Sequence, residues 1–201
     1  MNILRISSSI KGDASASDKL AKAISAKIIE THPDAKETVV ELSKTRFSHL
    51  DPEILGAFFT PSDQRSETQH ELAANSDRSI RQLFDADVIV IGVAFYNFGI
   101  PDKLKTWIDY IVRSGQTFKV EDGKPVALVN GKKVYLAIAS GWAYSDGPMK
   151  AMDFTEPYLR TVLGFIGLTD ITVFRSENVG IPELKEQSEN KTLEAVAEYE
   201  F

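Results

Sequence analysis

The sequence predicts an α/β fold in which helices cover both faces of a five-stranded, parallel, doubly wound sheet. Short apolar runs of extended character alternate along the 201 residues with segments whose apolar side chains recur at helical spacing. Alternation of this kind is typical of βαβ units, which build mostly parallel sheets. The run Val88-Ile89-Val90-Ile91 is apolar at every position, as expected for a central strand that is covered on both faces.

Five segments are predicted to be strands because they are short and rich in β-branched or other apolar residues. They are residues 3–7, 38–42, 88–93, 134–139 and 171–174. Five helices are expected between and after them, in residues 20–28, 72–84, 104–111, 154–165 and 183–201. Ser17 or Asp18 is expected to cap the first helix, and Pro101 suits the first turn of the third.

No change of composition, repeat or low-complexity linker divides the chain, so residues 1–201 are expected to form a single domain. Two segments are longer than simple connections require. Residues 43–63 carry too many large apolar side chains for a solvated linker: Phe47, Leu50, Ile54, Leu55, Phe58 and Phe59. These side chains form either a side cluster of the same core or a dimer wall or pocket rim.

The second long segment, residues 115–133, contains Asp122-Gly123 and Asn130-Gly131, and both pairs are hairpin-turn signals. It is expected to carry Phe118 away from the main sheet, toward a ligand or a partner.

Composition excludes several classes of function. The formal charge is −6, with 29 acidic against 23 basic residues, so the basic surplus of a nucleic-acid-binding protein is absent. No apolar run approaches the roughly 20 residues that span a bilayer, and the first residues lack a secretory signature. The sequence therefore predicts a cytoplasmic protein with neither a membrane nor a nucleic acid as partner.

The chain has no cysteine, which excludes disulfides, thiolate-ligated metal clusters and a Cys nucleophile. Any redox chemistry must therefore come from a bound cofactor. His32, His49 and His70 lie in polar contexts without metal-ligand spacing, so we expect them at the surface and expect no metal site.

Ligands of doubly wound sheets bind outside the carboxyl ends of the strands. The loop after the first predicted strand contains neither a Walker A sequence nor a Gly-x-Gly-x-x-Gly fingerprint. It instead offers the hydroxyl groups of Ser9, Ser15 and Ser17 and the free N–H groups of a helix start. These donors suit a phosphate monoester. The alternative is a serine-rich helix cap without a ligand.

Two further loops complete the predicted site. After the central strand, Phe95, Tyr96 and Phe98 surround Asn97, which suits a planar heteroaromatic ring with polar edges, such as a flavin. Core aromatics that merely close a loop would give the same pattern. After the fourth predicted strand, Ser140 can bond the pyrimidine edge of such a ring, and Gly141 permits close backbone approach.

At these residues the chain resembles the FMN-dependent NADH azoreductases, a branch of the flavodoxin-like quinone reductases. The resemblance runs in order through nearly the whole chain. The shared segments are Ser9…Ser15-x-Ser17, Tyr96-Asn97-Phe98, Leu104-Lys105 through Trp107-Ile108-Asp109, Arg113-x-Gly115-x-Thr117-Phe118, Ser140-Gly141, Asp146-Gly147-Pro148, Pro157-Tyr158-Leu159 and Leu163-Gly164-Phe165-Ile166-Gly167.

The resemblance implies a flavodoxin-like fold and a homodimer with one FMN per subunit at the interface. It implies that Ser9, Ser15 and Ser17 hold the FMN phosphate, and that Ser140 and Gly141 meet the pyrimidine side of the ring. The residues that line the isoalloxazine would be Phe95, Tyr96, Asn97 and Phe98. Phe118 and Phe165 would wall the substrate pocket, with Phe118 reaching across the dimer.

The implied reaction is two-electron, ping-pong reduction of quinones and aromatic azo compounds by NADH or NADPH. The flavin N5 would carry the hydride, and no catalytic acid or base is expected from the protein. The chain departs from the family pattern at Ala94 and Phe95, at Ala16 and at Trp142. The Trp142 ring is expected to narrow the substrate pocket or to stack on the substrate.

Two other classes of protein share parts of this pattern. A flavodoxin-type electron carrier would bind FMN but would have no small-molecule substrate of its own. The long segments 43–63 and 115–133 argue against it, because they indicate a built pocket and a dimer. An α/β hydrolase would need a Gly-x-Ser-x-Gly elbow, which is absent, and the three histidines all precede most of the predicted sheet.

Overall fold

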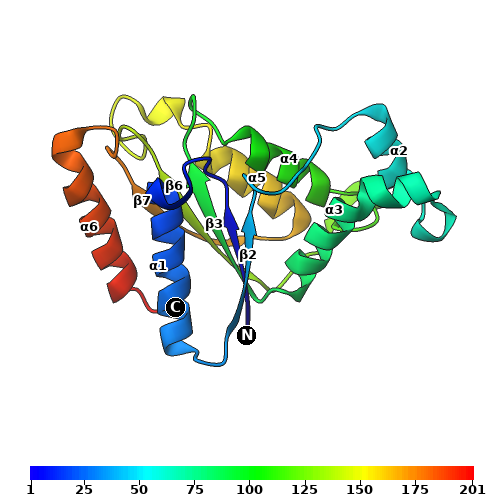
Figure 1. Cartoon of the computed structure of the whole chain (residues 1–201), viewed down its shortest axis with the longest axis horizontal. Coiled ribbons are helices and arrows are strands. Elements are labelled where there is room, and N and C mark those ends of the chain that lie inside the picture. The colour runs from blue at the N-terminus through cyan, green and yellow to red at the C-terminus, as the bar shows by residue number, and fades with distance from the viewer.

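Five parallel strands form the central sheet of the computed structural model, in the order β2-β1-β3-β6-β7 (Figure 1). The structure describes residues 1–201, apart from the side chain of Asp13. All five predicted strands are confirmed, and their bounds differ from the predicted ones by at most two residues. They are β1 (Asn2–Ser7), β2 (Lys36–Glu41), β3 (Val88–Ala94), β6 (Lys133–Ala139) and β7 (Asp170–Ser176).

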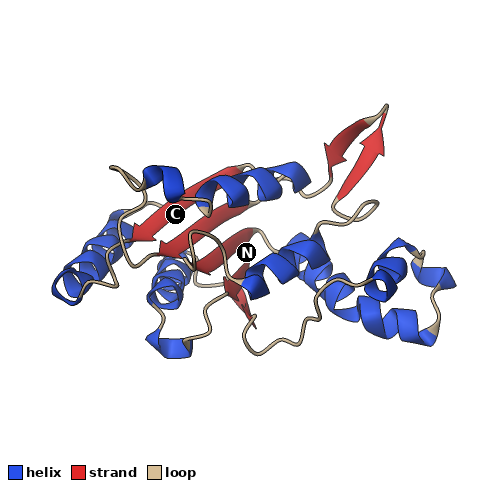
Figure 2. Ribbon diagram, turned by 90° about the horizontal axis from the view of Figure 1, so that it is seen from above, coloured by secondary structure: helices blue, strands red, loops and turns tan.

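Helices cover both faces of this sheet, as predicted. Helices α1 (Ala16–Thr31) and α6 (Pro182–Glu198) share one face, where Val90 and Phe174 point into the core. Helices α3 (Glu67–Asp85), α4 (Asp102–Ile111) and α5 (Glu156–Ile166) share the other face, where Ile89, Ile91 and Leu136 are fully buried (Figures 1 and 2). Successive side chains of β3 point to opposite faces of the sheet, and helices cover both faces. Every position of β3 is therefore buried, which explains why the strand is apolar throughout.

Three predictions at helix ends were wrong. Helix α1 is capped by Ser15, whose Oγ accepts a hydrogen bond from the Asp18 amide over 3.3 Å, and Asp18 itself forms an ion pair with Arg5. Pro101 is the residue before α4 and is not in its first turn. Helix α6 ends at Glu198, because the chain turns back to pack Phe201 against Tyr135, with ring centroids 5.0 Å apart.

The large apolar side chains of the first long segment, residues 43–63, divide into a buried and an exposed set. It contains an additional helix, α2 (Pro52–Phe59). Phe47, Ile54 and Phe58 are buried in the main core, whereas Leu55 and Phe59 are exposed by 44% and 71%. The core interpretation is therefore confirmed for one face of α2, and Leu55 and Phe59 on the other face line a cavity, as a pocket rim would. The dimer wall stays a prediction.

The second long segment forms an antiparallel hairpin of β4 (Phe118–Glu121) and β5 (Lys124–Ala127), which projects away from the sheet (Figure 2). Asp122 and Gly123 turn this hairpin with positive φ angles of 50° and 74°, as predicted. The prediction for Asn130-Gly131 was wrong. These residues lie between β5 and β6, which are not paired with each other. No described helix is long and apolar enough to cross a membrane.

Candidate functional site

The predicted site loops follow β1, β3 and β6, which are neighbours in the sheet. Because the strands are parallel, these loops leave the same carboxyl edge. We call residues 8–15 the first loop, residues 95–101 the second and residues 140–148 the third. β1 lies between β2 and β3, so the connections to its two neighbours run in opposite directions from this point, which is where doubly wound sheets bind ligands.

The first loop is folded by its own serines. Ser8 is fully buried, and its Oγ donates to the Gly92 carbonyl over 2.7 Å, which ties the loop to β3. The Oγ atoms of Ser15 and Ser17 lie 3.0 Å apart, and Ser9 Oγ lies 3.3 Å from the Tyr96 hydroxyl. These contacts gather three hydroxyl groups around the start of α1, whose first N–H groups have no helical partner.

The second loop begins with a tight turn at residues 96–99. Tyr96 and Gly99 exchange two backbone hydrogen bonds of 3.0 Å each. The turn residues Asn97 and Phe98 have φ angles of 49° and 69°. A left-handed conformation is unusual for Phe and costs on the order of 1 kcal/mol, so this turn is held by its surroundings. One such restraint is the Phe154 amide, which donates to the Phe98 carbonyl over 3.1 Å.

One cavity of about 280 Å³ joins the loops at the carboxyl edge. It brings together six of the predicted cofactor-binding residues, namely Ser9, Ser15, Ser17, Phe95, Tyr96 and Gly141. Lys11, Val179, Gly180 and Lys185 are among the other lining residues, and the sequence analysis did not assign them to the site. The last three belong to the loop after β7 and to α6. The loop after β7 also leaves the carboxyl edge of the sheet, and this position is the signal that could have identified it.

Three predicted cofactor-binding residues adjoin this cavity without lining it. Asn97 and Phe98 are exposed, with Phe98 at 43%. Ser140 is buried, and its hydroxyl donates to the Trp142 carbonyl over 2.7 Å. Their contacts with a flavin stay predictions.

The three predicted substrate-pocket residues occupy two different places. Trp142 belongs to the third loop and is 54% exposed. Phe118 and Phe165 pack against each other, with ring centroids 4.7 Å apart, at the far ends of α4 and α5. Phe118 lines a second cavity of about 280 Å³ whose walls are mostly apolar, together with Leu50, Leu55, Phe58, Phe59, Ile108, Asp109, Val112, Arg113, Ser114, Tyr158 and Val162.

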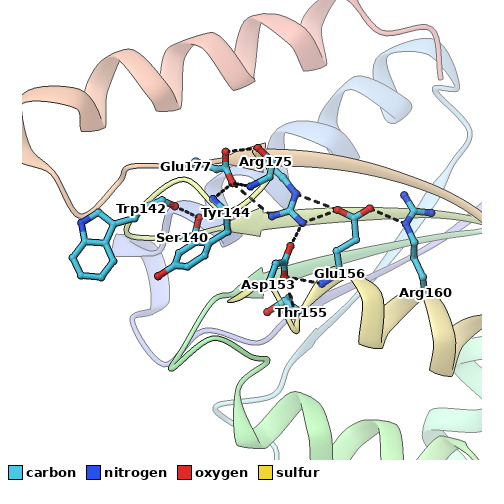
Figure 3. A network of polar contacts seen from close by, with 10 residues as sticks. Ser140, Trp142, Tyr144, Asp153, Thr155, Glu156, Arg160, Arg175 and Glu177 are labelled. Carbon is cyan, nitrogen blue, oxygen red and sulfur yellow. Dashed lines mark hydrogen bonds and ion pairs between the residues drawn. The ribbon is translucent and has the colours of Figure 1, made fainter. Parts of the chain in front are cut away.

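A network of charged side chains lies beside the third loop and contacts it through Glu177 (Figure 3). Arg175 donates to Glu156 Oε2 over 2.6 Å and also to Asp153. Burial raises the pKa of Glu156, but hydrogen bonds from Arg175 and Arg160 outweigh it, so that the pKa lies below its ordinary value. At the other end of the network, Glu177 accepts hydrogen bonds from the third loop.

Residues 1–200 match the family described as having a flavodoxin-like fold. The chain is 49% identical over 179 residues to an FMN-dependent NADH:quinone oxidoreductase of Herminiimonas arsenicoxydans, covering 89% of this chain and 88% of that protein. The chain belongs to this flavodoxin-like family of oxidoreductases. A second member, FMN-dependent NADH:quinone oxidoreductase 6 of Burkholderia lata, is 41% identical over 196 residues, which cover 97% of this chain and 98% of that protein.

A solved structure supports the same membership. The crystal structure of an azoreductase from Bacillus anthracis superposes with a TM-score of 0.89 at 28% sequence identity, covering 98% of this chain and 97% of that one. The family resemblance stated from the sequence motifs is therefore confirmed, and so is the flavodoxin-like fold.

Proposed function

We propose that this family member binds FMN in the carboxyl-edge cavity and uses NADH to reduce quinones and aromatic azo compounds. The observation that carries the proposal is the convergence of three independently predicted loops on one cavity beside the start of α1. The relatives described above bear the name of the same activity. The cytoplasm, which holds an NADH pool, is the proposed location.

The phosphate end of FMN fits the first loop. Ser15 and Ser17 are almost fully buried, and their hydroxyl groups face the helix start together with that of Ser9. The helix dipole and the unpaired N–H groups favour a dianion at this position. Lys11 and Lys185 line the same cavity and add positive charge.

The ring of FMN fits the other side of the cavity. Phe95 and Tyr96 supply an apolar wall, and Gly141 leaves room for close approach of the ring to the backbone. We propose that Asn97 reaches the polar edge of the ring from its left-handed turn, and that Phe98 and Ser140 complete the surroundings.

FMN supplies the chemistry when it is bound, since it accepts two electrons as hydride from NADH and delivers them to the acceptor. The protein orients both substrates against the ring and excludes water from it. We assign no protein acid or base to the reaction, because the flavin itself would exchange the hydride.

A second copy of the chain is proposed to complete the site. Phe165 lies near the end of α5, about 14 Å along the helix axis from its start beside the second loop. Phe165, and Phe118 packed against it, do not line the carboxyl-edge cavity of their own chain. We propose that they wall the partner's substrate pocket, while the exposed Leu55 and Phe59 pack in the interface. Light scattering of the purified protein is expected to give the mass of a dimer.

The alternative function is that of a flavodoxin-type electron carrier. Anaerobic mixing with NADH, followed by a quinone or an azo dye, separates the two. The enzyme is expected to lose the visible absorbance of oxidised flavin with NADH and to regain it with the acceptor. An oxidised flavin after NADH addition would refute the oxidoreductase, and colourless protein that takes up no FMN would refute the cofactor site.

A further inference from the structure

Glu177 follows β7 directly and holds the third loop through three hydrogen bonds. Its Oε1 accepts from the backbone amides of Tyr144 and Ser145, both over 2.7 Å. Its Oε2 accepts from the Ser145 hydroxyl over 2.6 Å. Figure 3 shows this carboxylate directly beside the loop that carries Tyr144. A single carboxylate thus fixes two consecutive peptide groups, which leaves this part of the loop little freedom.

The segment that follows Glu177 clamps the beginning of the same loop. The amide of Val179 donates to the Ser140 carbonyl and the amide of Gly180 to the Gly141 carbonyl, each over 3.1 Å. Val179 and Gly180 also line the carboxyl-edge cavity. The loop after β7 therefore shapes the third loop along its length and also forms part of the cavity wall.

The loop position that Glu177 fixes is linked to the cavity by the stacking of Tyr144 on Phe95. Tyr144 is 4% exposed, and its ring lies on that of Phe95 with centroids 4.3 Å apart and planes 23° apart. Phe98 meets the same ring edge-on at 6.2 Å. Phe95 lines the cavity, so the backbone position of Tyr144 decides where this wall stands.

The charge of Glu177 is not needed to neutralise Arg175. Arg175 Nη1 lies 3.7 Å from Glu177 Oε1, beyond hydrogen-bond distance, while two other carboxylates, those of Asp153 and Glu156, bond the guanidinium directly. The nearer partners of Glu177 are the N–H and O–H groups of the third loop. A glutamine could keep these contacts, with its oxygen facing the two amides and its NH₂ group facing the Ser145 hydroxyl.

We propose that Glu177 is a positioning residue for the flavin site, and that it acts by holding Tyr144 behind Phe95. The inference rests on the proposed function, because it assigns Glu177 a role at the FMN cavity. The proposed role depends on the hydrogen bonds that hold the third loop in position and not on the charge of Glu177. The neutral variant Glu177→Gln and the truncated variant Glu177→Ala must therefore behave differently.

The test compares Glu177→Ala with Glu177→Gln. FMN affinity is measured by fluorescence titration of protein freed of FMN, together with visible circular dichroism of the bound flavin. Glu177→Ala is expected to weaken FMN binding about tenfold, because the three hydrogen bonds that hold the third loop are lost, and to change the flavin dichroism. Glu177→Gln is expected to stay within about twofold of wild type in affinity. Ser145→Ala, which removes one of the three contacts, should fall between them.

Glu156→Ala is the matched control, because it deletes a carboxylate of the same network that does not touch the third loop. It is expected to lower the melting temperature while leaving FMN affinity within about twofold of wild type. Equal FMN losses in Glu156→Ala and Glu177→Ala would overturn the proposal, since network stability alone would then explain both. A loss in Glu177→Gln as large as in Glu177→Ala would overturn it in favour of charge.

The positioning role and the proposed function can fail separately. If wild-type protein does not bind FMN, the cofactor site is wrong. The near-ultraviolet dichroism of the FMN-free protein then decides on the role of Glu177, because it reports the stack of Tyr144 on Phe95. An unchanged aromatic signal in Glu177→Ala would refute the positioning role.

Discussion

The rings of Phe118 and Phe165 pack 4.7 Å apart within one chain, and they join the hairpin of β4 and β5 to the end of α5. Neither residue lines the carboxyl-edge cavity of that chain. Phe118 lines the second cavity, which is formed largely by α2 and α4 and lies apart from the carboxyl-edge cavity. In the dimer proposed above, these two rings would face the partner subunit.

Phe165→Ala is therefore expected to reduce kcat/KM for a quinone by about tenfold without changing FMN affinity, because an aromatic wall of the partner's pocket is lost. Steady-state kinetics and FMN titration check this. Val120→Ala, at a 62% exposed position of the same hairpin, is the control and should behave as wild type. Loss of FMN from Phe165→Ala would place the residue at its own chain's cofactor site instead.

Substitutions of Ser15 and Ser17, at the start of α1, are expected to differ in their effect on the stability of the fold. Ser15→Ala removes the N-cap and should lower the free energy of unfolding by about 1 kcal/mol in addition to weakening FMN binding. Ser17→Ala should weaken FMN binding and leave the cap in place. Urea unfolding of the FMN-free proteins, paired with FMN titration, separates the two effects. Identical unfolding curves for both variants would contradict the assignment of the cap.

The contact of Asp77 with two arginines is expected to make stability depend on pH. Asp77 accepts from Arg113 over 2.7 Å and from Arg65 over 2.6 Å, which joins α3 to the segment after α4 and to the connection from α2. Burial raises the pKa of Asp77, but these hydrogen bonds outweigh it and hold the pKa below its ordinary value. A lowered folded-state pKa stabilises the fold above the unfolded-state pKa of about 3.9, and this contribution is lost as pH falls through the folded-state pKa.

Asp77→Asn is thus expected to lower the free energy of unfolding at pH 7 by about 2 kcal/mol, since it leaves the buried Arg113 without its charged partner. The difference from wild type should shrink as the pH falls below about 4. Urea unfolding across this range is the measurement. Glu30→Gln, which alters an exposed pair with Lys27, should change stability by less than about 0.5 kcal/mol. A difference between wild type and Asp77→Asn that grew on acidification would refute this account.

Gly167 ends α5 with a φ of 110°, and a Cβ there would lie 2.4 Å from the Val129 carbonyl oxygen. Gly167→Ala is expected to cost more than about 2 kcal/mol, because both the backbone conformation and the space forbid a side chain. Gly123→Ala is the matched control, with a φ of 74° but no neighbour within 4 Å, and should cost about 1 kcal/mol. Thermal unfolding checks both, and equal costs would show that the collision at Gly167 is relieved elsewhere.

Much of this fold could be predicted from local patterns. The all-apolar run of β3 and the helical spacing of α1 depend on neighbours within one or two turns, so the chain itself carries that information. The serine and aromatic loops were predicted because parallel strands must place their following loops at one edge. Helix α2 was not predicted, and the sequence left open whether Phe58 belongs to the core, because both depend on which face of this segment meets the sheet.

The sequence by itself determined the class of the fold, the family and the three loops that surround the cavity. The tertiary structure alone decided which groups meet across long separations, such as Glu177 with Tyr144 and Ser145 or Phe118 with Phe165. It also decided that Ser15, and not Ser17 or Asp18, caps α1, because Arg5 on the neighbouring strand engages Asp18. Periodicity is a property of adjacent residues, whereas a hydrogen bond between two loops exists only once the strands beneath them are side by side.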